Sequence, residues 1–146
     1  MNQIKLYAGV FWIYVLVDVG YQLLFGMQFT AAQYEAAGMG PLIASPPRYP
    51  FLFFLFFVAI TIANVELAVK PALEKRSLGL ALRNGAIIGF TTYGTLAWVN
   101  TWTFKDFPVL VMFEIMFEGL CFSTVASGLT TRWRIRAQGS ANDSDG

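Results

Sequence analysis

The sequence contains no histidine and only one cysteine, Cys121, in 146 residues. A disulfide within the chain, a metal site built from Cys and His, and catalysis by a Cys–His or Ser–His pair are therefore excluded. Charged residues are also scarce, at 13% of the chain, whereas hydrophobic residues make up 56%. Soluble domains are normally less apolar and more highly charged, so the composition indicates a protein that uses the lipid bilayer as its solvent.

Four apolar stretches are long enough to cross a membrane. A helical span needs about 20 residues to cross roughly 30 Å of hydrocarbon, and that length is met by residues 6–27, 50–69, 85–104 and 108–131. These stretches predict an all-α integral membrane bundle of four transmembrane helices, in a single domain covering residues 1–131. Residues 132–146 are expected to form a basic end followed by a disordered tail from Ala137, because the tail is small and polar.

The basic residues are distributed very unevenly among the loops. Eight of the ten lie before the first span, between the second and third spans, or after the fourth, and only Arg48 and Lys105 lie elsewhere. Cytoplasmic loops carry this excess of Lys and Arg, so both termini are predicted to be cytoplasmic. The basic residues form no separate domain, which gives nucleic-acid binding no support.

The two outer loops differ in length. Residues 29–37 are expected to form a short interfacial helix, which the glycines and prolines that follow would separate from the second span. The other outer loop is only residues 105–107, so the third and fourth spans are expected to form a tight antiparallel hairpin.

Four carboxylates lie within these apolar segments: Asp18, Glu66, Glu114 and Glu118. An ionisable group in hydrocarbon is costly, and it usually marks a transport pathway, a proton site or a buried polar network. Glu66 precedes Lys70 by one helical turn near the cytoplasmic end of its span, so an interfacial ion pair is the expected role. The other three acids are the best indication of function.

The polar and small residues of each span fall on one face when plotted at about 100° per residue. That face is expected to turn inward, because polar groups exposed to lipid would lack hydrogen-bond partners. From the first span to the fourth, the predicted inward residues are Tyr7, Phe11, Tyr14, Asp18, Gln22 and Phe25; Phe57, Thr61, Asn64 and Ala68; Gly85, Gly89, Tyr93, Asn100 and Thr103; and Glu114, Glu118 and Cys121.

Several of these residues are expected to lie at similar depths in the bilayer. At a rise of about 1.5 Å per residue from the cytoplasmic end, Asp18 lies at roughly 18 Å and Glu118 at about 20 Å. By the same rise Asn100 lies at about 22 Å and Glu114 at about 26 Å. Tyr14, Gln22, Asn64 and Tyr93 are candidates to extend this polar site.

No basic residue lies at that depth to neutralise the acids, so they are expected to share protons or to hold a cation. Carboxylate and amide oxygens are ligands that Mg²⁺, Ca²⁺ or Mn²⁺ would accept, which makes a divalent cation one candidate ligand. The alternative is that protonated acids only join the helices through hydrogen bonds.

Two ladders of small residues permit close approach between helices. The ladder in the fourth span points about 140–220° away from Glu114 on a helical wheel, which suggests an outward face and a homodimer contact. The alternative is packing against a neighbour within the chain. The ladders consist of Ala81, Gly85 and Gly89 and of Gly119, Ser123 and Ser127.

Several short motifs, spread over nearly the whole chain, resemble a bacterial inner-membrane family known as domain of unknown function 2177. The resemblance implies a multi-pass protein of the inner (plasma) membrane with four helices, and it implies no specific activity. The motifs are Asp18, Met39–Ala44, Val69–Leu73, Gly85–Gly89, Tyr93–Thr95, Asn100 and Asp106–Pro108.

The chain departs from the family pattern at two places, as a divergent member would. Where the family has roughly Thr-Tyr-Asp-Leu-Thr-Asn, residues 95–100 lack the acid at Ala97 and the hydroxyl at Val99. A later family motif with one acid becomes residues 114–118, which keep an acid as Glu114 and add Glu118. The acid cluster is therefore rearranged relative to typical members.

Three functions remain open at this point. The favoured hypothesis is a small membrane protein that binds or translocates a proton, a cation or a small polar ligand through its acid-lined bundle. The second is a membrane-embedded enzyme acting on a lipid or isoprenoid, with Asp18 and the glutamates as general acid and base. The third is a non-catalytic assembly subunit that uses the small-residue ladders.

Overall fold

The computed structural model describes residues 3–39 and 50–143, and its regular structure within these ranges is helical throughout. The first rod joins α1 (Gln3–Tyr21), the π-helix η1 (Gln22–Gly26) and α2 (Met27–Ala36). The second rod joins α4 (Pro50–Ala63), the π-helix η2 (Asn64–Val69) and α5 (Lys70–Glu74). Two single helices follow, α6 (Leu78–Thr103) and α7 (Val109–Asp143).

Three of the helical rods are long and apolar enough to cross a membrane: Gln3–Ala36, Phe54–Glu74 and Val109–Gln138. Helix α6, with 26 residues, is long enough as well, but its sequence contains Arg83, two asparagines and several threonines. The described chain is therefore an all-helical membrane protein with three spans that qualify by length and composition.

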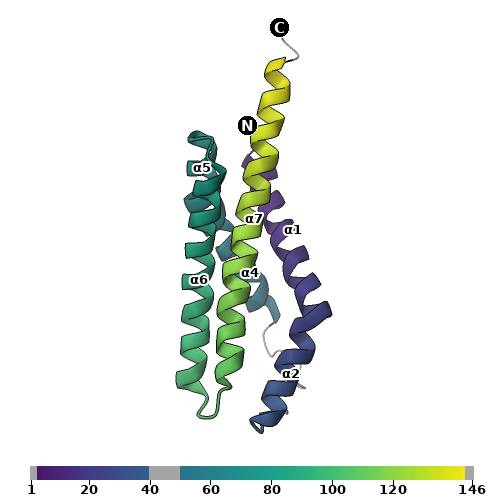
Figure 1. The fold of residues 1–146 in the computed structure, drawn as a ribbon, viewed down its shortest axis with the longest axis vertical. Coiled ribbons are helices and arrows are strands. Elements are labelled where there is room, and N and C mark those ends of the chain that lie inside the picture. Colours follow the sequence, from purple (N-terminus) through teal and green to yellow (C-terminus); the bar gives the residue numbers. More distant parts are fainter. Residues whose placement is uncertain (1–2, 40–49, 144–146) are drawn as a thin grey trace.

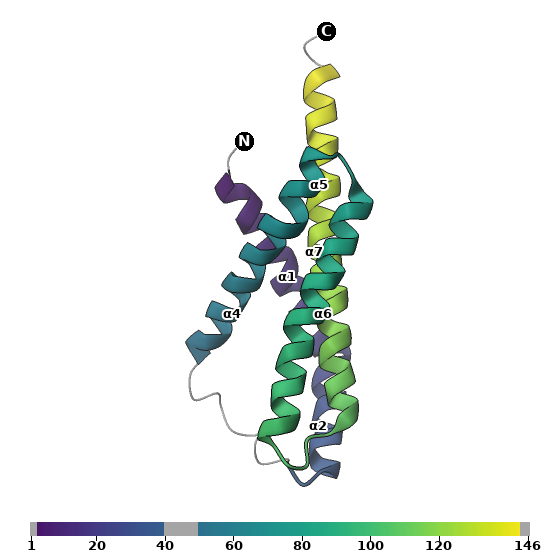
Figure 2. The same cartoon turned by 90° about the vertical axis from the view of Figure 1, so that its left-hand side faces the viewer.

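Helix α7 contacts α6, α1, α2, α5 and η2. Helices α6 and α7 run antiparallel along each other, and α1 packs on another side of α7. The N-terminal end, α5 and the C-terminal end lie at one end of the bundle, whereas the α6–α7 loop and α2 lie at the opposite end (Figure 1). Among the described helices, α4 contacts α1 and α6 but not α7, and Figure 2 shows it diverging from the other helices.

Small residues bring α6 and α7 into close backbone contact. A methyl group added at Gly85 would lie 2.7 Å from the backbone oxygen of Ser123, and one at Gly89 would overlap the backbone of Gly119. Ser123 and Ser127 are fully buried inside the chain. The ladder of Gly119, Ser123 and Ser127 is therefore an internal contact, which corrects its interpretation as a homodimer surface.

The buried faces agree in part with the helical wheel. Tyr14, Thr61, Asn64 and Ala68 are buried as expected, as are Gly85, Gly89 and Tyr93. Phe25 and Thr103 are exposed, which contradicts their inward placement. The reason for Phe25 is local, because it lies inside η1, where the wider turn of a π-helix rotates later residues away from a 3.6-residue repeat.

Two boundaries differ from those expected. Residues 29–36 are helical, but η1 joins them to the first rod, so they form no separate interfacial helix. Helix α7 continues to Asp143, beyond the predicted end of the span at residue 131 and into the segment for which disorder was expected. Residues 132–143 contain no proline and a single glycine, Gly139, so no proline stops the helix there.

Candidate functional site

A cavity of about 460 Å³ lies between α1, η1, α4, α6 and α7. Asp18, Gln22 and Glu118 supply its charged and amide groups. Its remaining lining residues are aromatic or aliphatic: Phe56, Phe57, Tyr93, Leu96 and Ile115. The cavity therefore combines polar groups with apolar walls, is partly open to its surroundings, and is lined by residues from all four rods.

The π-helix η1 places Gln22 against the buried acid Glu118. The Gln22 amide donates a hydrogen bond to Glu118 Oε1 at 3.0 Å. Gly26 makes room for this arrangement, since a methyl group there would lie 2.5 Å from Gln22 Oε1 and 2.8 Å from the Tyr21 ring. Gln22 and Glu118, both predicted site residues, are thus joined by a hydrogen bond for which Gly26 of the π-helix leaves space.

Asp18 has a different environment from the two glutamates. It is half-buried and makes no hydrogen bond or ion pair with any of the described residues. It lines the same cavity as Glu118 and lies within electrostatic range of it. Since none of the lining residues is Lys or Arg, the cavity contains two carboxyl groups without a basic partner.

Glu114 is buried but already has hydrogen-bond partners on both carboxylate oxygens. The Tyr21 hydroxyl donates to Oε1 at 3.0 Å, and the Thr30 hydroxyl donates to Oε2 at 2.9 Å. Glu114 therefore joins α7 to both α1 and α2. For this acid the hydrogen bonds agree with the alternative hypothesis, in which the acids only join helices. Neither partner was a predicted site residue, although Tyr21 lies three residues after Asp18 and so shares its helix face.

Tyr93, which lines the cavity, lies beside Tyr14, with ring centroids 6.5 Å apart. Tyr14 is fully buried. Its hydroxyl has Tyr93 and Ser123 as neighbours but has no hydrogen-bond partner of good geometry among the described residues. Phe57 and Phe122 surround Tyr14 edge-on. Tyr14 is therefore part of an aromatic cluster, of which Phe57 and Tyr93 also line the cavity.

Asn64 and Asn100 lie apart from the acids. Asn64 is fully buried and its amide donates to Ser123 Oγ at 3.3 Å, while Ser127 Oγ donates to Asn64 Oδ1 at 2.8 Å. Asn100 is half-buried, lies outside the cavity lining, and forms no hydrogen bond with the three acids in the described structure. The polar site centred on the cavity is therefore smaller than the predicted set.

The arrangement of acids bears on the candidate divalent cation. Within residues 3–39 and 50–143, no three Asp, Glu, Cys or His side chains lie close enough together to hold a metal ion. Glu114 uses its oxygens on Tyr21 and Thr30, which leaves Asp18 and Glu118 as the acids that face the cavity. Two carboxylates and one amide form a poorer site for a divalent cation than a set of six or more oxygen ligands.

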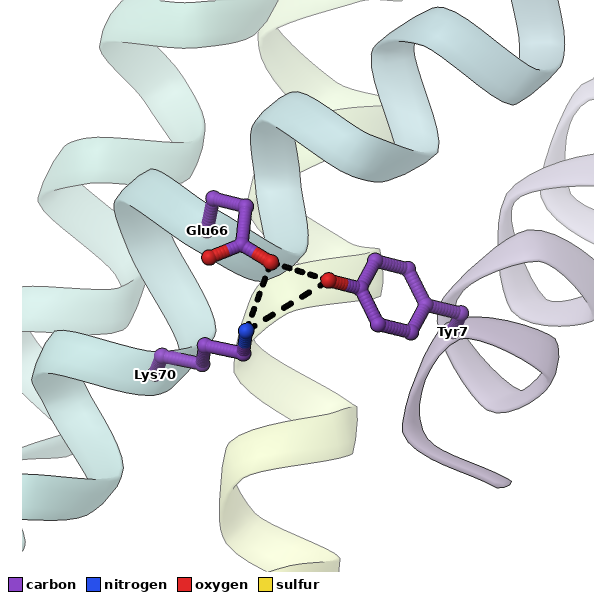
Figure 3. Close-up of polar contacts among 3 residues, drawn as sticks. All are labelled: Tyr7, Glu66 and Lys70. Carbon is purple, nitrogen blue, oxygen red and sulfur yellow. Dashed lines mark hydrogen bonds and ion pairs between the residues drawn. The ribbon is translucent and has the colours of Figure 1, made fainter. Parts of the chain in front are cut away.

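The expected pair of Glu66 and Lys70 is present in the second rod. Lys70 Nζ lies 2.6 Å from Glu66 Oε1, and the Tyr7 hydroxyl of α1 donates to the same carboxylate oxygen (Figure 3). The Lys70 ammonium also lies 5.6 Å from the centre of the Tyr7 ring. This pair was predicted correctly, and Tyr7 is the additional residue that connects it to the first rod.

Comparison with known proteins gives a family but no activity. A family model described as "Predicted membrane protein (DUF2177)" matches residues 3–132 of the chain. No curated protein and no solved structure matches the chain. The match covers all of the residues that form the cavity.

Proposed function

The chain belongs to the DUF2177 family of membrane proteins, and we propose that it binds a proton or a small polar ligand in the cavity lined by Asp18, Gln22 and Glu118. The observation that carries this proposal is the pair of carboxyl groups, Asp18 and Glu118, in one cavity without a basic partner. Acids placed in this way within a membrane span exchange protons or bind a cationic or hydrogen-bonding ligand.

The contrast between the acids supports a ligand at Asp18 and Glu118 in particular. Glu114 is joined to Tyr21 and Thr30, as expected of an acid that holds helices together. Asp18 has no such partner in the described structure, and Glu118 has one partner on one of its two oxygens. Hydrogen-bonding capacity therefore remains at the cavity, where a ligand could use it.

We further propose that all four rods span a bacterial inner membrane, with both termini in the cytoplasm. Helix α6 runs antiparallel along α7, and this pairing would place α6 at the same depth as its apolar neighbour. The N-terminal end, α5 with the start of α6, and the C-terminal end lie together, and eight of the ten basic residues belong to these segments. An excess of Lys and Arg on one side is typical of the cytoplasmic face.

The proposal is tested by the titration of the two cavity acids. The full chain in lipid nanodiscs is titrated by infrared difference spectroscopy, which detects the carbonyl band of a protonated carboxyl group. The samples are the wild type, Asp18→Asn, Glu118→Gln and the double variant, with Asp106→Asn as a matched change at an exposed loop acid. We expect each cavity substitution to shift the titration of the remaining acid, whereas Asp106→Asn leaves both unchanged. Two independent titrations, each unaffected by loss of the other acid, would contradict a shared site.

A further inference from the structure

We propose that the ligand of the cavity is a hydrophobic organic cation, such as a protonated amine, whose charged group lies between Asp18 and Glu118. This inference rests on the proposed function and names its ligand class. It is drawn from the size of the cavity, the sign of its charged groups and the chemistry of its walls.

The size of the cavity favours a molecule over a bare ion. Its volume of about 460 Å³ lies within the range of sites that hold small organic ligands. A proton or metal ion would use only the carboxyl groups and would leave the rest of the space to solvent. The apolar residues Leu96 and Ile115 offer a surface on which the body of an organic ligand can be buried.

The sign of the charged groups selects a cation and excludes a phosphate. Asp18 and Glu118 are the ionisable carboxyl groups of the lining, Gln22 supplies an amide, and no Lys or Arg is present there. A phosphate group would find no positive partner and would be repelled by both acids. The isoprenoid phosphates and phospholipids that a lipid-modifying enzyme would bind therefore fit this cavity poorly, whereas an amine without phosphate fits.

The aromatic walls provide a second attraction for a positive charge. Phe56, Phe57 and Tyr93 all line the cavity, and the rings of Phe56 and Tyr93 pack edge to face with centroids 5.4 Å apart. An ammonium group near the face of an aromatic ring is stabilised by the quadrupole of the ring. The rings therefore add a second attraction for the positive charge to that of the two carboxyl groups.

The experiment compares two ligands of nearly equal shape on the full-length chain in phosphatidylcholine nanodiscs. The probes are 1-aminoadamantane, which is protonated at neutral pH, and the neutral 1-adamantanol, with binding followed by tryptophan fluorescence or calorimetry. We expect the amine to bind at least about tenfold more tightly than the alcohol, because only the amine gains the carboxylate and aromatic interactions. Equal affinity for the two probes in the wild type would overturn the inference without any variant being needed.

Variants then test whether the preference for the amine over the alcohol depends on Asp18 and Glu118. Asp18→Asn combined with Glu118→Gln is expected to remove most of the preference for the amine, whereas the loop variant Asp106→Asn retains it. An undiminished preference in the double variant would place the cation elsewhere and overturn the inference. Competition by phosphatidylethanolamine, whose ammonium group is attached to a phosphate, would also overturn it. Coupled titration of Asp18 and Glu118 together with equal affinity for amine and alcohol would leave the proposed function intact and reject only the ligand class.

Discussion

Ser127 of α7 donates a hydrogen bond to Asn64 of η2, with 2.8 Å between Ser127 Oγ and Asn64 Oδ1. Both side chains are fully buried, and the Asn64 amide also bonds to Ser123 Oγ and to the backbone oxygen of Ile60. This network attaches the second rod to α7 at the junction of α4 and η2. It is therefore one of the polar contacts that attach the second rod, which supplies Phe56 and Phe57 to the cavity, to its neighbours.

The first prediction concerns this anchor. Asn64→Ala is expected to destabilise the folded protein by about 1–2 kcal/mol, the range of hydrogen bonds between membrane helices. Unfolding in mixed micelles of increasing SDS content provides the measurement. A double-mutant cycle with Ser127→Ala isolates the bond, and Thr103→Ala serves as a control because the Thr103 hydroxyl bonds only to its own helix at Val99. Additive effects of Asn64→Ala and Ser127→Ala would show that the two residues are not coupled.

The second prediction concerns the contact between α6 and α7. Gly89→Ala places a methyl group against the backbone of Gly119, so the helices must separate, and the expected cost is about 1–3 kcal/mol. Gly94→Ala is the matched control on the same helix, because its nearest neighbour is the flexible side chain of Met116 at 3.9 Å. The same SDS titration compares the two variants. Equal stability of Gly89→Ala and Gly94→Ala would contradict the close contact.

The third prediction concerns the glycine that positions Gln22. In Gly26→Ala the new methyl group displaces the Gln22 side chain, and with it the hydrogen bond to Glu118. We expect binding of the amine probe to weaken by about threefold to tenfold, corresponding to roughly one hydrogen bond. Gly20→Ala is the control in the same rod, since a methyl group there meets nothing within 4 Å. A normal affinity in a folded Gly26→Ala variant would show that the orientation of Gln22 is unimportant.

The fourth prediction concerns Glu66. Its carboxylate is partly exposed, with Lys70 and Tyr7 as partners, so Glu66→Gln is expected to leave folding nearly unchanged. The fraction of folded protein recovered after detergent extraction and mild heating is the readout, with Tyr7→Phe measured beside it. A large loss of folded protein in Glu66→Gln but not in Tyr7→Phe would mean that the pair of Glu66 and Lys70 itself stabilises the fold, whereas a large loss in both would assign it to the contact with α1.

The fifth prediction concerns orientation in the membrane. With Cys121 replaced by Ser, single cysteines at the exposed residues 75 and 105 are expected to react with a membrane-impermeant reagent from opposite sides. Residue 75 follows α5 on the proposed cytoplasmic side, and residue 105 lies in the α6–α7 loop. Labelling of both from the same side of sealed vesicles would contradict the four-span arrangement.

The sequence by itself determined the class of the protein and the partner of one of its acids. Long apolar segments must be helical in lipid because every backbone group needs a partner there. The all-helical membrane class therefore follows from these segments alone. The spacing of Glu66 and Lys70 on one helix predicted their ion pair correctly, because residues four apart are neighbours. Asp18, Gln22 and Glu118 were also among the predicted site residues.

Only the tertiary structure decided which of these residues share a cavity. A helical wheel gives the direction of a side chain on a straight α-helix, but η1 and η2 change the helical repeat after Tyr21 and after Ala63. The pairing of Glu114 with Thr30 required α2 to continue the first rod, and the burial of Gly119, Ser123 and Ser127 required α7 to pack against α6, α1 and η2 at once. A helix in the middle of a bundle buries more than one face, and the number of its neighbours is a property of the packing that residue spacing within one helix does not contain.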